Sequence, residues 1–268
     1  MKWLEEENLT VKTCSYTDLL SYAKQLKDRG MSVHTLNCYL RNIKYYYQYL
    51  QERNEIEKNP ASRLKIKGAI EKLPEDLLSK KELNTIYVNY QTETAVQKRN
   101  KILLGLAIYQ GMRLDELEAM EPADIDLHQG KVYIRQVGRA RRRTLKLEAH
   151  QILPLQDYIE NALPEIREKA NKESEKLIMS TGKSSGIKEL ICDLNKTLRK
   201  HYPRYKNLQQ LRSSRISLWV EEKNIIEAQY MAGHRSIRST ERYKKVNMKE
   251  LKEALDKYHP IASAQSHL

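Results

Sequence analysis

The sequence has few cysteines and no long apolar run. Cys14, Cys38 and Cys192 form no C-x-x-C pair and no clustered histidines accompany them, which argues against a disulfide framework or a zinc site. No apolar stretch approaches the ~18 residues of a membrane-spanning helix, and MKWLEEENLT lacks the apolar centre of a signal peptide. We therefore predict a cytoplasmic protein with no membrane partner.

Acidic residues are also in deficit. The 268 residues include 35 acidic and 48 basic side chains, for a net charge of +13 and a pI near 9.4. A pI this high indicates a polyanionic partner, and nucleic acid is the commonest one, although many unrelated proteins are equally basic. Hydrophobic residues at 40% suffice for the core of one large or two modest domains.

The N-terminal quarter has the pattern of two helices. TDLLSYAKQLKDRG predicts a short helix that stops at Gly30, and Ser32 is a suitable cap for a longer one. The apolar stripe of the longer helix is Val33, Leu36, Leu40, Ile43, Tyr47 and Leu50. Pro60 and RLKIKGAIEKLPEDL then interrupt the pattern. We expect a helical domain over residues 1–66, a linker over 67–74 and a second domain over 75–268.

The second domain is predicted to be mostly helical with one β-hairpin, so the fold class is mainly α. SKKE, residues 79–82, has a capping-box pattern, and an apolar helix over residues 102–109 ends near Gly111. KVYIRQVGRARRRTLKL alternates apolar and polar residues around Gly138, as a hairpin does. The cations expected at its tip are Arg139, Arg141, Arg142 and Arg143. They would repel one another unless an anion lies nearby; a solvated charged turn is the alternative.

MAGHRSIRSTERYKKV contains one histidine and one tyrosine in a small, polar and cationic run. Tyr243 follows His234 by nine residues, which puts it on the opposite face of a continuous helix. Gly233 and the pair Ser236 and Ser239 are natural interruptions, so a helix–turn–helix step could bring both side chains into one cleft. The alternative is a surface helix with a buried tyrosine edge.

The order of an arginine, a basic hairpin, a second arginine, Gly-His and a tyrosine resembles the tyrosine recombinases, or phage-type integrases, and in particular their two-domain, Xer-like members. The residues that carry the resemblance are Gly111, Arg113 and Glu116 of G-x-R-x-x-E, Leu211 and Arg212, Gly233 and His234, and Tyr243. Residues 15–67 are similar to the family's helical core-binding (SAM-like) domain, and the chain from Leu73 onward to its catalytic domain. WLEEENLT resembles the end of the first core-binding helix.

The resemblance implies a DNA strand transfer. Tyr243 would attack a phosphodiester to give a 3′-phosphotyrosine and a free 5′-hydroxyl, with local positive charge assisting the attack. Arg113 and Arg212 would bind the phosphate oxygens and stabilise the transition state, and His234 would bind the same phosphate or position Tyr243. Glu116 would orient Arg113. Arginines neutralise the phosphate, so no metal or other cofactor is implied.

Two positions depart from the family pattern. The family has a lysine on the hairpin as general acid, but Arg139 follows Gly138 here, and a guanidinium gives up a proton poorly. Lys146 could replace it only in a different hairpin register. Gln209 stands where the family's H-x-x-R box begins with histidine, and an amide cannot shuttle a proton.

The resemblance also implies the partners: double-stranded DNA with inverted-repeat sites, a homotetramer on that DNA, and possible accessory proteins. The predicted DNA contacts outside the catalytic residues are Arg41, Lys44, Lys65, Lys67, Arg141, Arg142, Arg143 and Arg215. In the family a C-terminal tail docks on the neighbouring subunit. Here the apolar stripe Met248, Leu251, Leu255 and Tyr258 predicts such a tail helix, and packing on its own domain is the alternative.

The predicted activity is site-specific recombination, for integration or excision of a mobile element. Two readings compete with it. A type IB topoisomerase shares the catalytic residues but rejoins the same strand. A catalytically weak DNA-binding protein of the same fold would account for Gln209 and Arg139.

Overall fold

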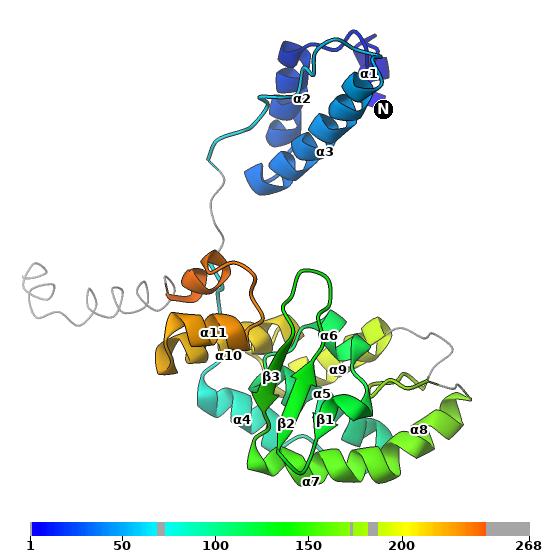
Figure 1. Ribbon diagram of the computed structural model, residues 1–268, viewed down its shortest axis with the longest axis vertical. Coiled ribbons are helices and arrows are strands. Elements are labelled where there is room, and N and C mark those ends of the chain that lie inside the picture. The colour runs from blue at the N-terminus through cyan, green and yellow to red at the C-terminus, as the bar shows by residue number, and fades with distance from the viewer. Residues whose placement is uncertain (1, 69–72, 172–173, 182–186, 245–268) are drawn as a thin grey trace, which may run out of the picture. The chain divides into compact units, whose positions relative to one another are not determined.

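The computed structural model describes residues 2–68, 73–171, 174–181 and 187–244. The chain forms two compact units, Met1–Lys72 and Leu73–Leu268. In these ranges helices dominate both units, and one three-stranded sheet lies in the second (Figure 1). The predicted fold class, mainly α with a small β-hairpin, is confirmed. Within the described ranges, no helix combines the length and the apolar character that crossing a bilayer requires.

The first unit is built on two capped helices. Its helices are α1 (Lys2–Glu6), α2 (Tyr16–Asp28) and α3 (Val33–Glu52). Ser15 and Ser32 accept hydrogen bonds from the first turns of α2 and α3, so the predicted cap at Ser32 is confirmed. The buried side chains of α3 are Leu36, Leu40, Tyr47 and Leu50, and they belong to the predicted stripe. They pack with α2 around a core of their own.

The segment after α3 is held along that helix by side-chain hydrogen bonds. Asn37 donates to the carbonyl of Ile66 at 2.8 Å and accepts from its backbone N–H at 3.0 Å. Lys44 donates to the carbonyl of Ser62 at 2.7 Å. Lys65 and Lys67 are exposed on either side of Ile66, whose backbone is hydrogen-bonded to Asn37. These two lysines therefore belong to the first unit and extend its cationic surface.

The second unit combines one small sheet with many helices among its described residues. Its elements are α4 (Lys80–Val88), α5 (Ala95–Tyr109), α6 (Leu114–Ala119), η1 (Pro122–Asp124), β1 (Ile125–Asp126), β2 (Lys131–Ile134), β3 (Arg143–Lys146), α7 (Ala149–Asp157), η2 (Tyr158–Ala162), α8 (Leu163–Ala170), α9 (Ile187–His201), α10 (Leu208–Glu222) and α11 (Ile225–Met231). Residues 238–244 are also helical. The capping box predicted at Ser79 is present at the start of α4.

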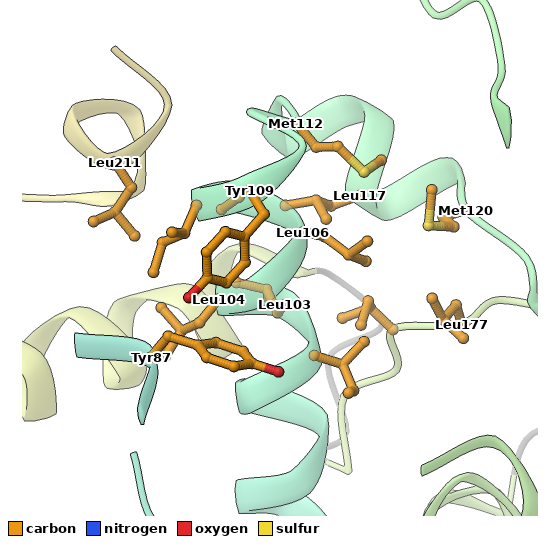
Figure 2. Packing of buried hydrophobic residues seen from close by; sticks show 14 of the residues in the cluster. Tyr87, Leu103, Leu104, Leu106, Tyr109, Met112, Leu117, Met120, Leu177 and Leu211 are labelled. Atoms are coloured by element: carbon orange, nitrogen blue, oxygen red, sulfur yellow. The ribbon is translucent and has the colours of Figure 1, made fainter. Parts of the chain in front are cut away.

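Helix α5 forms the centre of the second core. Eight consecutive residues, 102–109, are buried, and Figure 2 shows several of them among Tyr87, Leu117 and Leu211. A Cβ atom on Gly105 would lie 2.9 Å from the Tyr87 ring, so only glycine lets α4 approach α5 this closely. The helix ends at Tyr109, and Gly111 turns the chain with a φ of +54°. The predicted end of the helix near Gly111 is confirmed.

The predicted hairpin is present, with one more strand beside it. The sheet is antiparallel in the order β1-β2-β3, and Ile134 pairs with Arg143 at its end. Residues 135–142 form the connecting loop, which projects beyond the strands in Figure 1. The backbone N–H of Arg141 donates to the carbonyl of Gly233 at 3.1 Å, so the loop is tied to the turn that follows α11.

That turn interrupts the helical run where the sequence predicts it. Gly233 has a φ of +64°, and the backbone N–H of Ser239 donates to the carbonyl of Ser236 before the helix over residues 238–244. The helix–turn–helix step predicted here is confirmed. The predicted tail helix, with Met248 to Tyr258, lies outside the described residues.

Candidate active site

A cleft of about 530 Å³ in the second unit collects most of the predicted catalytic residues. Its lining residues are Arg113, Leu114, Asp115, Glu118, Lys188, Gln209, Arg212, His234, Ser239, Arg242 and Tyr243. They come from α6, α9, α10 and the turn and helix that follow α11. The tertiary fold therefore brings together five predicted site residues that are as much as 130 positions apart, from Arg113 to Tyr243.

Arg113 stands where α6 begins. Its backbone N–H donates to the Glu116 carboxylate at 2.8 Å, which closes the first turn of the helix. Gly111 precedes it in a left-handed conformation, packed on the Trp219 ring. This tight turn directs the half-buried Arg113 side chain into the cleft.

Arg212 is the most enclosed cation of the cleft, at 2% exposure. Its guanidinium donates to the carbonyl of Gly111 and, at 2.7 Å, to the carbonyl of Ala232. Burial lowers the pKa of Arg212 to about 10, with Glu116 opposing the shift and Arg143 and Arg113 adding to it. The side chain remains a cation at neutral pH, and its orientation is set by the backbone carbonyls of two separate segments, at Gly111 and at Ala232.

Arg143 is not at the hairpin tip, and that prediction is wrong. It is the first residue of β3, is 2% exposed, and forms a two-pronged ion pair with Glu116 through Nη1–Oε1 and Nη2–Oε2 distances of 2.6 and 2.9 Å. Alternation along β3 turns Arg143 inward and leaves Thr144 exposed. Arg143 is enclosed, is paired with a carboxylate and does not line the cleft, so it is not available to DNA in this structure.

Glu116 interacts with Arg143 as well as with Arg113. Glu116 accepts a hydrogen bond from the backbone N–H of Arg113 and also forms an ion pair with the Arg143 side chain. Burial alone would raise the pKa of Glu116, but the hydrogen bonds and charge of Arg143, the Arg113 N–H and the charge of Arg212 outweigh it. The pKa is held below its usual range, so Glu116 is an anion that compensates two buried arginines.

His234 is buried against Arg212 and Thr240. Its Nδ1 lies 3.0 Å from the Thr240 hydroxyl oxygen, and its Nε2 lies 3.5 Å from Nη2 of Arg212. A guanidinium only donates, so Nε2 is the acceptor and Nδ1 carries the proton. Burial lowers the pKa of His234 to about 3, with the charges of Arg212, Arg113 and Arg143 adding to the shift. The imidazole is neutral at neutral pH.

Tyr243 lies directly beside this imidazole. The two rings are stacked with centroids 6.4 Å apart and an angle of 20° between their planes. The Tyr243 hydroxyl donates to the Ser213 hydroxyl at 3.4 Å, and the residue is 7% exposed. The turn at Gly233 thus converts a nine-residue separation into ring contact, as the sequence predicts for a helix–turn–helix step.

Of the two residues that depart from the family pattern, Gln209 lies in the cleft and Arg139 lies outside it. Gln209 lines the cleft, and its side-chain amide donates to the Ser213 hydroxyl at 3.3 Å. Arg139 lies in the exposed hairpin loop and is not among the residues that line the cleft. Arg141 and Arg142 are exposed in the same loop. Lys146 pairs with Lys131 at the other end of the hairpin, so the register that would have made it a substitute is absent.

Arg215, one of the predicted DNA contacts, has a largely enclosed side chain with an exposure of 12%. Its guanidinium lies over the Trp219 ring at 5.5 Å, and Nε donates to the carbonyl of Tyr109 at 3.2 Å. Burial lowers its pKa, against the opposing charge of Glu148. Arg215 lines a separate hollow between α4, β3, α10 and α11. In the first unit, Arg41 is exposed on α3 and Lys44 is partly covered.

Sequence reasoning missed several residues of the cleft. Lys188 lines it from α9, Ser213 and Thr240 bind the side chains of Tyr243 and His234, and Asp115 and Glu118 add negative charge. Ser213 could have been noticed, because it follows Arg212 on one helix. Lys188 carries no local signal, since nothing in the order of residues around it indicates which helix faces the cleft. In the described parts of the chain, no group of three histidine, cysteine or acidic side chains could hold a metal ion.

Known proteins are similar to this chain in sequence. The chain is 26% identical over 266 residues to tyrosine recombinase XerD of Oceanobacillus iheyensis, covering 96% of this chain and 86% of that protein. It is 24% identical over 268 residues to tyrosine recombinase XerC of the same organism, with coverages of 97% and 86%.

Solved structures are similar in fold. XerH site-specific recombinase bound to a palindromic difH substrate matches with a TM-score of 0.71 and 20% identity, over 91% of this chain and 72% of that one. The Tn1549 transposon integrase in complex with a circular intermediate DNA matches with a TM-score of 0.67 and 16% identity, with coverages of 91% and 87%. A family model, that of the phage integrase family, matches residues 76–250, which is more than half of the chain. The chain therefore belongs to the phage integrase family, the tyrosine recombinases.

Proposed function

We propose that this tyrosine recombinase cleaves and rejoins DNA strands at specific sites with Tyr243 as the nucleophile. The observation that carries the proposal is the Tyr243 ring stacked on His234, next to the buried Arg212, in a cleft that also contains Arg113. Fixed positive charge around a hydroxyl is what a phosphodiester needs for nucleophilic displacement.

The reaction is a displacement at phosphorus. The Tyr243 oxygen bonds to phosphorus as the bond to the 5′-oxygen breaks, giving a 3′-phosphotyrosine and a 5′-hydroxyl. Arg113 and Arg212 bind the non-bridging oxygens, and arginine keeps its charge throughout. The reverse attack by a 5′-hydroxyl of a partner strand rejoins the DNA. One phosphoester replaces another, so the reaction needs no external energy.

His234 and Glu116 support these groups. A histidine with a pKa near 3 is a poor base, so His234 acts through its neutral ring, which stacks on Tyr243 and accepts a hydrogen bond from Arg212. Glu116 holds the backbone of Arg113 and the side chain of Arg143, which ties the first turn of α6 to β3. Both residues fix positions before substrate arrives, and preorganisation of this kind lowers the activation barrier.

The DNA partner is double-stranded DNA with inverted-repeat sites, bound by four copies of the chain in the cytoplasm, with accessory proteins as possible further partners. The exposed cations support a DNA partner: Arg41, Lys65, Lys67, Arg139, Arg141 and Arg142. The similarity to recombinases solved with bound DNA also supports it. We propose integration or excision of a mobile element as the outcome, with the C-terminal tail linking neighbouring subunits.

The test is covalent capture on nicked DNA. Protein and a Tyr243→Phe variant are incubated with short nicked duplexes drawn from the host genome, and DNA that remains bound after SDS is sequenced. A nick lets the 5′-fragment diffuse away, so the intermediate accumulates. We expect an adduct with the unmodified protein, enriched for inverted repeats, and none with Tyr243→Phe.

Two controls make this result decisive. Tyr230→Phe changes an exposed tyrosine outside the cleft and should form the adduct normally. Tyr243→Phe should still bind the captured sites without a covalent bond, because it keeps the ring that stacks on His234. DNA binding with no adduct under any condition would contradict the proposal and favour an architectural role.

A further inference from the structure

The displaced 5′-oxygen needs a proton, and the cleft offers few donors. An alkoxide is a poor leaving group, and a positioned general acid is worth ~10²–10⁴-fold in rate. The guanidinium of Arg113 gives up a proton poorly, and the amide of Gln209 does not ionise. The two terminal nitrogens of Arg212 are directed at the carbonyls of Gly111 and Ala232 rather than at a leaving group. His234 is neutral because burial and neighbouring arginines lower its pKa to about 3. Asp115 and Glu118 are acceptors as carboxylates.

The hairpin offers no better donor. Arg139 is a guanidinium and lies in the exposed loop, outside the cleft lining. The loop is held by the hydrogen bond from Arg141 to the carbonyl of Gly233 and by the enclosed Arg143–Glu116 pair that follows it. No lysine occurs between Lys131 and Lys146. The hairpin loop, residues 135–142, therefore lacks a side chain suited to transferring a proton.

One lysine lines the described part of the cleft, and it is on another element. Lys188 is the second residue of α9, whose buried residues Ile187, Leu190 and Ile191 anchor that end of the helix in the core. The anchored face turns the Lys188 side chain outward, where it borders the cleft that contains Tyr243, Arg212 and Arg113. An ammonium, unlike a guanidinium, can give up a proton in catalysis.

We propose that Lys188 is the general acid that protonates the leaving 5′-oxygen, in place of a hairpin lysine. The proposal rests on the function proposed above and names a further catalytic residue for it. As the bond between phosphorus and the 5′-oxygen breaks, its electron pair goes to oxygen and takes a proton from the Lys188 Nζ. The Tyr243 proton leaves to water, and the neutral amine regains a proton from water or from the attacking 5′-hydroxyl during rejoining.

A sulfur substitution in the DNA tests the step directly. Nicked substrates are made with either oxygen or sulfur as the 5′-bridging atom, and a thiolate leaves without a proton because it is a far weaker base than an alkoxide. On the oxygen substrate we expect Lys188→Ala and Lys188→Arg to form the Tyr243 adduct ~10²–10⁴-fold more slowly. On the sulfur substrate both variants should return to within a few-fold of the unmodified protein.

Matched variants separate the possible results. Lys196→Ala removes an exposed lysine from the same helix, outside the cleft, and should match the unmodified protein on both substrates. Noncovalent DNA binding by Lys188→Ala is measured alongside, since loss of a phosphate contact alone would slow both substrates equally. That equal slowing, or normal cleavage of the oxygen substrate, overturns the proposal.

Arg139→Ala is the competing variant. If it is slow on oxygen and restored by sulfur while Lys188→Ala is not, the hairpin supplies the acid and Lys188 does not. If the unmodified protein forms no adduct with either substrate, the proposed function itself fails. If it forms adducts but Lys188→Ala is not restored by sulfur, only the assignment of Lys188 fails.

Discussion

The two units of the chain differ in whether they bury charged and polar side chains. The buried polar and charged side chains of the described residues all belong to the second unit: Arg99, Asn100, Gln110, Glu116, Asp124, Arg143, Gln151, Gln210, Arg212, Ser214, Ser217, His234 and Thr240. The first unit buries hydrophobic residues around Leu36 and Leu40. The hydroxyl of its buried Tyr47 donates a hydrogen bond to the carbonyl of Val11 at 3.0 Å. Its cations stay at or near the surface.

This difference separates two ways of using an arginine or lysine. An exposed cation costs little to fold and can meet a phosphate backbone anywhere along it. A buried cation costs several kcal/mol of desolvation unless a carboxylate and hydrogen bonds compensate it. Arg143 and Arg212 have this compensation from Glu116 and from backbone carbonyls. The second unit thus accepts a cost in stability for a fixed orientation, which a catalytic site needs and a general DNA contact does not.

Removing the shared carboxylate should have the largest effect. Glu116→Gln leaves Arg143 and Arg212 buried without an anion, and breaking a buried pair costs ~3–5 kcal/mol in the free energy of unfolding. Urea denaturation followed by tryptophan fluorescence measures it, since Trp219 lies in this core. Glu222→Gln, which removes the surface partner of Lys80, should cost ~0–1 kcal/mol. Equal losses for the two variants would mean that the buried pair adds nothing.

A core truncation in the first unit should cost somewhat less and act on that unit. Leu36→Ala removes a fully buried side chain between α2 and α3, and such a change costs ~2–5 kcal/mol. Limited proteolysis should cut residues 1–72 earlier and leave the second unit as resistant as before. Leu20→Ala, at a 40% exposed position on α2, should change stability by less than ~0.5 kcal/mol. Faster cleavage within both units would show that their stabilities are coupled.

The buried histidine should make stability depend on pH. Folded His234 has a pKa near 3 and the unfolded chain one near 6.5, so between these values the unfolded state binds more protons. The contribution of His234 to the free energy of unfolding is therefore fully present above pH 6.5. It falls by up to ~1.4 kcal/mol for each pH unit below that value. Urea titrations from pH 7 to pH 5 should give a shallower slope for His234→Gln. An unchanged slope would place the histidine in a solvated setting.

The smallest effect concerns the exposed cations. Arg41→Ala in the first unit and Arg142→Ala in the second should each reduce the slope of log binding constant against log salt by ~1 for noncovalent DNA binding. Tyr243→Phe protein serves as the background, so that no adduct forms. Lys12→Ala, a surface residue paired with Glu55, should leave the slope unchanged. A slope that stays constant in the two arginine variants would exclude those residues as phosphate contacts.

Local patterns predicted much of the fold. The caps at Ser32 and Ser79, the apolar stripe of α3, the hairpin around Gly138 and the turn at Gly233 all follow from rules that act over a few residues. These rules do not report which charged residues are buried. Arg143 was expected at the surface because Arg141, Arg142 and Arg143 look alike in sequence. Its partner Glu116 lies 27 residues away.

The sequence by itself determined which chemical groups this recombinase has and in what order. It also determined several helix ends, such as the caps at Ser32 and Ser79 and the stop near Gly111, because caps and glycine turns are short-range. Tertiary structure alone decided which arginines are enclosed and which face solvent, that Glu116 joins β3 to the turn before α6, and that Lys188 borders the cleft of Tyr243. The reason is physical. The cost of burying a charge, and its compensation, depend on groups that only the packing of distant segments brings within hydrogen-bonding distance.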